Sequence, residues 1–222
     1  MKVKEIRDQF RLLIEKNATN NKLNVDTARF ILLFNFVTKR FQNYILEKRN
    51  EDAIRMLAPF LTLNKPLSVS EESETYTTYE KPEDYFEFSN VTIKATKANC
   101  KNKILLAHEI KSENVHQYLF DNFTKPSFLA RETLYLMSQD GLTVYKDIDF
   151  NLSEVQLSYY REIPDADIAG YKHLDKTESQ DIDTELPESA VPIVVMAMVK
   201  LFSMSSGDTT SYQIANSELF GL

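Results

Sequence analysis

Apolar residues in the first sixty positions recur at intervals of three and four, which is the period of a helix with one buried face. Asn and Asp are both residue types that cap helix N-termini well. The pattern predicts an amphipathic helix over 2–15, a longer one that begins near Asn24 or Asp26 and ends at residue 48, and a short one over 51–57. These stripes are typical of helices that pack against one another, and this interpretation is preferred to a cofactor site.

After Pro59 the pattern changes to an alternation of apolar and polar residues, which is typical of strands with one buried face. The pair Asp140-Gly141 between two apolar runs is a strong hairpin signal. One helix is expected over 113–119. The alternation predicts short strands over 61–64, 66–70, 75–80, 85–96, 103–110, 133–137, 142–146 and 155–160.

A polar, acidic stretch and a final helix are expected after the strands. Residues 162–188 contain nine acidic residues and two lysines, and from Leu186-Pro187-Glu188 the pattern becomes helical as far as Gly207. The expected fold is α+β, a helical bundle of the N- and C-terminal helices with an inserted antiparallel β domain that forms a barrel or a sandwich. Its expected parts are N-terminal helices (1–60), a β domain (61–161), an acidic loop (162–185), and a closing helix with a tail (186–222).

The composition excludes several classes of site. The chain has 222 residues, with 26 Lys and Arg against 33 Asp and Glu, and a net charge of −7. Its single cysteine, Cys100, excludes an intramolecular disulfide framework and a thiolate metal cluster. Four glycines leave little room for phosphate-binding loops. The N-terminus is charged and the longest apolar run, residues 190–202, is too short to span a bilayer, so a soluble protein of a reducing cytoplasm with no membrane partner is expected.

Charge is unevenly distributed along the chain. Residues 1–64 contain 12 basic and 7 acidic residues, whereas the remaining 158 residues contain 14 basic and 26 acidic ones. One interpretation is an acidic loop exposed to solvent. Another is a protein whose two ends face different neighbours, or whose acidic surface repels nucleic acid. The composition does not choose between these interpretations.

Candidate chemistry is limited to pairs of carboxylates. The sequence contains none of the common nucleotide-binding, hydrolase or metalloprotease motifs, and no catalytic, cofactor-binding or metal-ligating residue is assigned. On a strand, an Asp-x-Asp spacing would put both carboxylates on one face, where a hard cation could bridge them. Solvated loop carboxylates are the preferred interpretation, and a carboxylate-based metal-dependent enzyme or nuclease is the lower alternative. The three pairs are Asp147 with Asp149, Asp165 with Asp167, and Asp181 with Asp183.

Six short motifs occur in one order between residues 22 and 205. Together they resemble the head–tail adaptor (ring) proteins of short-tailed phages, especially those of crAss-like phages. In the first motif, a capped helix with the internal Asn35 is followed by an aromatic-basic segment that ends at Pro59. The later motifs are Lys81-Pro82-Glu83-Asp84-Tyr85 (with Lys81 in place of the usual Leu), the Asp-x-Phe-x-Lys-Pro-Ser loop at 121–127, the strand at 142–145, the Tyr-x-Arg-x-Pro segment within 157–164, and Leu186-Pro187-Glu188 with its helix.

The resemblance implies a structural component of the virion that is not an enzyme and binds no cofactor. Such proteins form a closed ring, twelve-fold like the portal, which docks on the portal protein and contacts the adjacent tail ring. Genomic DNA passes through the channel without sequence-specific binding. The implied location is the head–tail junction of the virion, after assembly in the host cytoplasm. Another ring of the tail stack or a head completion protein is the alternative within this class.

Two candidate interface features follow from the residues themselves. Phe123, Lys125, Pro126 and Phe128 form a compact aromatic-basic loop that could insert into a neighbouring subunit. An ordinary surface turn with a packed Phe is an equally good interpretation of the same loop. Arg161, directly after a predicted strand, is a candidate for an ion pair across a subunit boundary, although an exposed pair would add little stability.

Overall fold

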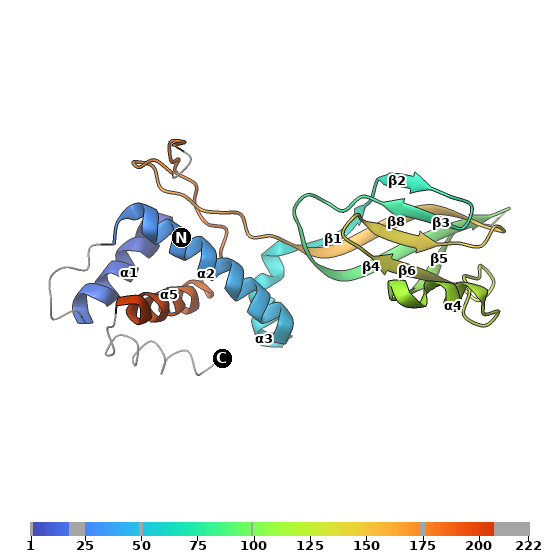
Figure 1. Cartoon of the computed structure of the whole chain (residues 1–222), viewed down its shortest axis with the longest axis horizontal. Helices are drawn as coiled ribbons and strands as arrows, with labels where there is room; N and C mark the ends of the chain where they lie inside the picture. The colour runs from blue at the N-terminus through green and yellow to red at the C-terminus, as the bar shows by residue number, and fades with distance from the viewer. Residues whose placement is uncertain (1, 18–24, 49–50, 99, 174–175, 207–222) are drawn as a thin grey trace. The chain divides into compact units, whose positions relative to one another are not determined.

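The computed structural model describes residues 2–17, 25–48, 51–98, 100–173 and 176–206 (Figure 1). The chain divides into two compact units. The helical unit comprises Met1–Phe60 and Glu162–Leu222, and the sheet unit comprises Leu61–Arg161. Each unit has its own core.

The helical unit is built around three longer helices, and α5 contacts both α1 and α2. The ring of Phe10 joins them, with its centroid 5.7 Å from that of Phe30 and 6.0 Å from that of Phe202. The side chain of Asp26 accepts a hydrogen bond from the amide of Arg29 at 2.7 Å, so this residue caps α2 as the sequence predicts. The elements are α1 (Val3–Asn17), α2 (Thr27–Lys48), α3 (Glu51–Ile54), the 3₁₀ helix η1 (Arg55–Phe60) and α5 (Val191–Ser206).

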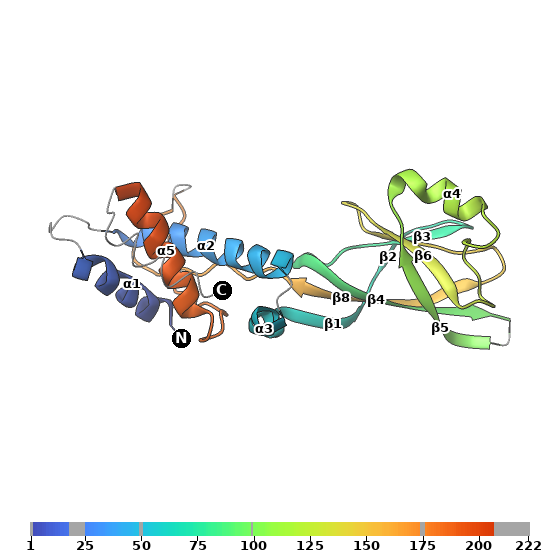
Figure 2. The same ribbon diagram turned by 90° about the horizontal axis from the view of Figure 1, so that it is seen from below.

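The sheet unit contains one curled, eight-stranded sheet in the order β1-β8-β4-β5-β6-β7-β3-β2 (Figure 2). β4 and β8 are its longest strands, and their buried residues pair across the ladder, Ile93 opposite Val155 and Val91 opposite Leu157. The bounds are β1 (Leu61–Pro66), β2 (Val69–Glu72), β3 (Tyr76–Tyr79), β4 (Tyr85–Lys97), β5 (Cys100–Glu109), β6 (Glu132–Met137), β7 (Leu142–Tyr145) and β8 (Asn151–Arg161).

The sheet has apolar clusters on both faces. On one face, a cluster that includes Ile93, Leu142 and Phe150 forms the main core. On the other, the connection between β5 and β6 supplies the 3₁₀ helix η2 (Ser112–Asn114) and helix α4 (Val115–Phe120), whose apolar residues pack on β6 and β7. The alternating pattern of the strands therefore places side chains in two separate cores.

The expected helical bundle with an inserted antiparallel β domain is wrong. β5 and β6 run parallel, with Leu106 paired with Glu132, so the sheet is mixed. Its strand order leaves β1 and β2 as edges, so the described strands form an open, curled sheet instead of a barrel or sandwich. Parallel neighbours require a crossover connection, and residues 110–131 with α4 provide it here. The helices are also no bundle by themselves, because the non-helical residues Ile163 and Ile168 are buried with them.

Smaller differences concern the closing helix. It begins at Val191 and not at Leu186, and residues 188–190 form a turn, so that Pro192 falls in the first helical turn, where proline is tolerated. The predicted cap Asn24, the stop at Gly207 and the tail beyond it lie outside the described residues. Within the described residues, no helix is both long enough and apolar enough to cross a membrane.

Candidate functional site

The predicted interface loop connects α4 to β6, and hydrogen bonds within the loop fix its backbone. The Asp121 side chain accepts a hydrogen bond from the amide of Phe123 at 3.0 Å, and its carbonyl oxygen accepts one from the amide of Lys125 at 3.0 Å. At the other end, Ser127 and Glu132 exchange two backbone hydrogen bonds of 2.9 and 3.1 Å. The loop 121–131 is therefore closed at both ends by polar contacts of its own.

The four predicted loop residues separate into a buried pair and an exposed pair. Pro126 and Phe128 are buried, and the Phe128 ring lies 5.9 Å from that of Phe150. The Lys103 ammonium lies 4.5 Å from the centre of the Phe128 ring. It also donates a hydrogen bond of 2.6 Å to the Phe128 carbonyl oxygen. Phe123, by contrast, is 93% exposed, and Lys125 is also exposed.

Large apolar side chains are exposed around this loop. Phe120 is 84% exposed, Leu129 is 83% exposed and Ile148 is 78% exposed. Ile148 belongs to the connection between β7 and β8, which an ion pair of 3.8 Å between Lys125 and Asp147 joins to the loop. The term apolar loop surface is used below for Phe120, Phe123, Leu129 and Ile148.

The apolar loop surface is suited to contact with another protein. Soluble monomers rarely expose several large apolar side chains in neighbouring segments, and such groups mark interaction sites. The sequence analysis found Phe123 but missed the other three residues. For Ile148 the available signal was its position between two aspartates, Asp147 and Asp149, in the connection between two predicted strands, and nothing in the sequence singled out Leu129.

Arg161 ends β8, where it pairs with Tyr85 of β4 in the sheet. Beside it, the buried Tyr159 hydroxyl donates a hydrogen bond of 2.7 Å to Asp84 and accepts one of 3.2 Å from the Lys65 ammonium. The hydrogen bond from Tyr159, with the charges of Lys65 and Arg161, lowers the pKa of Asp84 below its ordinary value. Arg161 thus contributes to an electrostatic group within the sheet unit.

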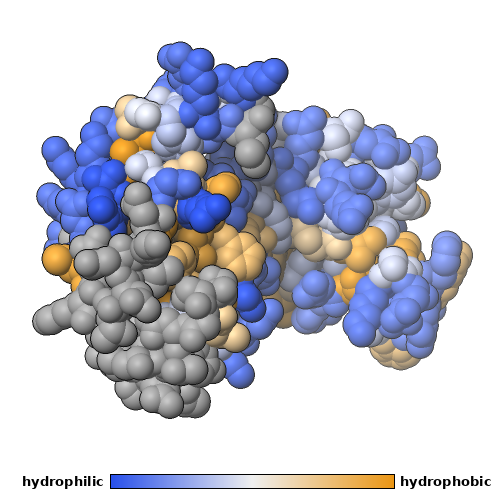
Figure 3. Space-filling view, turned by 60° about the vertical axis from the view of Figure 1, so that its left-hand side comes forward, coloured by the Kyte–Doolittle hydropathy of each residue, from blue (hydrophilic) through white to orange (hydrophobic). Residues whose placement is uncertain are grey.

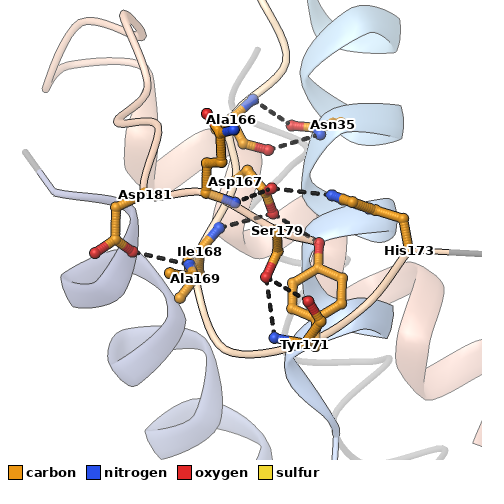
Figure 4. Close-up of polar contacts among 10 residues, drawn as sticks. Asn35, Ala166, Asp167, Ile168, Ala169, Tyr171, His173, Ser179 and Asp181 are labelled. Atoms are coloured by element: carbon orange, nitrogen blue, oxygen red, sulfur yellow. Dashed lines mark hydrogen bonds and ion pairs between the residues drawn. The ribbon is translucent and has the colours of Figure 1, made fainter. Parts of the chain in front are cut away.

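The acidic segment, residues 162–185, is attached to the helices of its own unit by side-chain contacts (Figure 4). Asn35 of α2 donates to the carbonyl oxygen of Ala166 at 3.0 Å and accepts from the amide of Ala166 at 3.1 Å. The ammonium of Lys39, one turn further along α2, lies 2.9 Å from the carboxylate of Glu162 and 3.1 Å from that of Asp165. Hydrogen bonds to these carboxylates raise the pKa of Lys39.

Asp167 holds the acidic segment together internally. One carboxylate oxygen accepts from the Ile168 amide at 2.8 Å and from the Tyr171 hydroxyl at 2.7 Å, and the other accepts from the Gln180 amide at 2.9 Å and contacts Nε2 of His173 at 3.0 Å. Burial by itself would raise the pKa of Asp167, but these hydrogen bonds outweigh burial and lower it. A carboxylate with this many donors fixes the conformation of the backbone that supplies them.

The two carboxylates of each Asp-x-Asp pair have different partners. In the first, Asp147 contacts Lys125 and Asp149 contacts Lys97. In the second, Asp165 contacts Lys39 whereas Asp167 is at the centre of the network described above. In the third, Asp181 contacts Lys4 at 2.7 Å and Asp183 accepts from the amide of Val3 at 3.3 Å.

These contacts also bear on the uneven distribution of charge. Lys4 and Lys39, from the basic N-terminal part, lie against acidic residues of the acidic segment in the same unit. Part of the opposite charge is therefore paired inside the helical unit. Among the described residues, no group of three or more His, Cys, Asp or Glu side chains is placed to hold a metal ion.

Comparisons with protein-family models and with curated protein sequences find no match to this chain. Its function is therefore inferred from its own residues and geometry.

Proposed function

We propose that the chain is a structural virion subunit, a ring-forming head–tail connector of a short-tailed phage. Its partners would be further copies of itself, the portal protein and the adjacent tail ring, with genomic DNA passing through the channel. The observation that carries the proposal is the apolar loop surface, whose four side chains are 78–93% exposed. A subunit clamped between neighbours needs such side chains, because burial of apolar area stabilises the contact.

The residues of the six motifs give a second line of support. Asn35, in the first motif, binds the backbone just after the Tyr-x-Arg-x-Pro segment. Asp84, in the second motif, accepts a hydrogen bond from Tyr159 of that same segment. These contacts join stretches that are far apart in the sequence, which is the role expected of such residues in a structural protein.

The loop motif itself fits the same proposal. Pro126 and Phe128 anchor it to the sheet unit, while Phe123 extends into solvent from a backbone that hydrogen bonds hold in place. A pre-organised loop loses less conformational entropy when a neighbour covers it. Phe123 is therefore the residue of the motif that we assign to the contact with a neighbouring subunit.

The test is quantitative mass spectrometry of purified particles of the phage that encodes the chain, normalised to the portal protein. We expect a constant ratio near one copy per portal subunit. Absence of the chain from intact particles would refute the proposal. A fixed ratio different from that of the portal would instead favour another ring of the tail or a head completion protein.

The role of the apolar loop surface is tested in the same particles. A phage supplied only with Phe123→Ser should incorporate less of the protein and yield fewer infectious particles. Asn122→Ser is the matched control, because residue 122 is exposed in the same loop and already polar. Equal incorporation of the two variants would show that Phe123 makes no assembly contact.

A further inference from the structure

Helix α2 has apolar residues on two faces. Its inner face is buried in the helical unit, with Phe30, Phe34 and Ile45 among its fully or almost fully buried side chains. Its outer face carries Leu32, which is 61% exposed, and Phe36, which is 53% exposed. On the surface in Figure 3, hydrophobic residues lie among hydrophilic ones. Among the described residues, Leu32, Phe36 and Tyr44 thus form an exposed apolar group on a face that also carries charged residues, and exposed apolar groups rimmed by polar residues mark interaction sites.

The outer face carries charged residues of both signs at its two ends. Successive residues of an α-helix turn by about 100°. Arg29 and Glu47 lie nine residues before and after Thr38. Nine residues make about two and a half helical turns, so both residues point in the direction opposite to Thr38. Thr38 is 3% exposed, whereas Arg29 and Glu47 are both exposed. A basic residue thus lies near the start of the outer face and an acidic residue near its end.

The remaining residues of the outer face are arranged about the same midpoint. Phe36 and Arg40 lie two residues on either side of position 38, and the Arg40 guanidinium lies 5.6 Å from the centre of the Phe36 ring. Leu32 and Tyr44 lie six residues on either side. When two copies of the face are placed antiparallel about residue 38, Arg29 of one lies opposite Glu47 of the other, Phe36 opposite Arg40, and Leu32 opposite Tyr44. The face is therefore self-complementary.

We infer that the free protein forms a dimer in which the outer faces of two α2 helices pack antiparallel. Arg29 of each copy would pair with Glu47 of the other, and Phe36 of each would lie under Arg40 of the other. The contact is isologous, since the same residues are used on both sides, so it closes at two copies and builds no ring. The dimer is a property of the protein before assembly and does not depend on the proposed function.

A groove beside α2 supports a second copy as the occupant. It lies between α2 and α5, has a volume of about 730 Å³, and is lined by Tyr44, Ile193 and Leu201 among others. In the antiparallel arrangement, Leu32 of the second copy lies opposite Tyr44, one of the residues that line this groove. The apolar contact area therefore extends from the outer face of α2 onto α5.

Exchange of the two charges tests the arrangement. In Arg29→Glu, two pairs of like charges would oppose each other across the interface, and the same holds for Glu47→Arg. The double variant, with both changes, restores two opposite pairs in the reverse sense. Both changes suit the helix dipole, because they put an acid near the N-terminus and a base near the C-terminus. Arg29→Glu also replaces the exposed 3.8 Å ion pair between Arg29 and Asp26 with two like charges, but such an exposed pair contributes little stability, so neither change should unfold α2.

The measurement is sedimentation equilibrium of the full chain over a wide range of concentration. We expect the mass to rise from 25.7 kDa to twice that value. Each single variant should raise the dissociation constant on the order of tenfold or more, and the double variant should return it close to the original. Lys101→Glu, an exposed change on β5, is the control that should leave the constant unchanged.

Three results would overturn the inference. They are a monomer at every concentration, two single variants that dimerise as the original does, and a double variant that stays as weak as the single ones. Circular dichroism of each variant shows that its helices are formed, so that weak association is not mistaken for unfolding.

Discussion

The side-chain amide of Asn35 and the peptide groups of Ala166 exchange two hydrogen bonds, of 3.0 and 3.1 Å, although the residues are 131 positions apart. Residues on two neighbouring β-strands exchange a pair of hydrogen bonds in the same way, but here the side-chain amide of a helical residue takes the place of one strand's backbone. Through it, α2 fixes the point at which the acidic segment begins to cross the helical unit.

Asn35→Ala should therefore destabilise the protein. The change leaves the amide and carbonyl of Ala166 without these partners in a partly buried place, and we expect a loss of about 1–3 kcal/mol in the free energy of unfolding. Urea unfolding measures it. Asn122→Ala, an exposed change in the connection between α4 and β6, is the control and should cost less than about 0.5 kcal/mol. Equal effects of the two changes would contradict the role assigned to Asn35.

Asp167 should make stability depend on acid pH. Its pKa is lower in the folded protein than its ordinary 3.8, so its ionised form favours the folded state. This contribution is fully present above pH 3.8 and is lost as the pH falls through the lowered value. In Asp167→Asn it is absent, so the gap in stability between the original and the variant should be large at neutral pH and shrink below pH 3.8. Urea unfolding at a series of pH values measures that gap.

The control for this experiment is Asp140→Asn, because Asn-Gly serves a hairpin turn as well as Asp-Gly does. Its stability should run parallel to that of the original protein throughout. A gap for Asp167→Asn that stays constant from neutral to acid pH would show that the carboxylate is not the source of the stabilisation.

Tyr159→Phe should lower the free energy of unfolding without creating a cavity in the core of the sheet unit, because the ring stays. It removes only the hydroxyl that donates to Asp84 and accepts from Lys65, and leaves these two half-exposed groups with only their own 3.7 Å ion pair. We expect a loss of about 1–2 kcal/mol. Thermal or urea unfolding measures the loss, with Tyr160→Phe at the next position as the comparison. A neutral Tyr159→Phe would mean that water replaces the hydroxyl at no cost.

Replacement of the two phenylalanines of this loop should affect stability to very different extents. Phe128→Ala removes a 5% exposed ring that packs on Phe150, so it should cost about 3–5 kcal/mol of stability. Phe123→Ala removes a 93% exposed ring and should change stability by less than about 0.5 kcal/mol. Denaturant unfolding of both variants checks the contrast. A large loss for Phe123→Ala would show that this ring supports the fold and is not held ready for a neighbour.

Most helices and strands could be predicted because N-caps and the spacing of apolar residues, both visible in neighbouring positions of the sequence, determine them. Asp26 caps α2, and the alternation in β4 and β8 places Ile93 and Val155 in the core. The sheet topology could not be predicted in the same way. The sequence predicts a helix between β5 and β6, and such a crossover favours a parallel pair, but the alternating pattern of the strands and the hairpin signal at Asp140-Gly141 favour a purely antiparallel domain.

The candidate site was predictable only in part, for a related reason. Phe123 and Phe128 lie in a loop without a period, so the sequence alone gives no sign that one is exposed and the other buried. The hydrogen bonds of Asp167 come from residues up to 13 positions away and depend on a backbone path that no repeating pattern specifies. Non-local contacts of this kind become visible only when the chain path is known.

The division of the helical unit into two stretches of chain has a consequence for synthesis on the ribosome. Residues 1–60 emerge first, but their partner α5 follows only after the whole of the sheet unit. Phe10 can pack on Phe30 at once but can contact Phe202 only after the sheet unit has been made, whereas the sheet unit, which is one continuous stretch, can complete its own core. A nascent chain that has just passed residue 161 therefore presents α1 and α2 without the contacts that α5 makes with both of them.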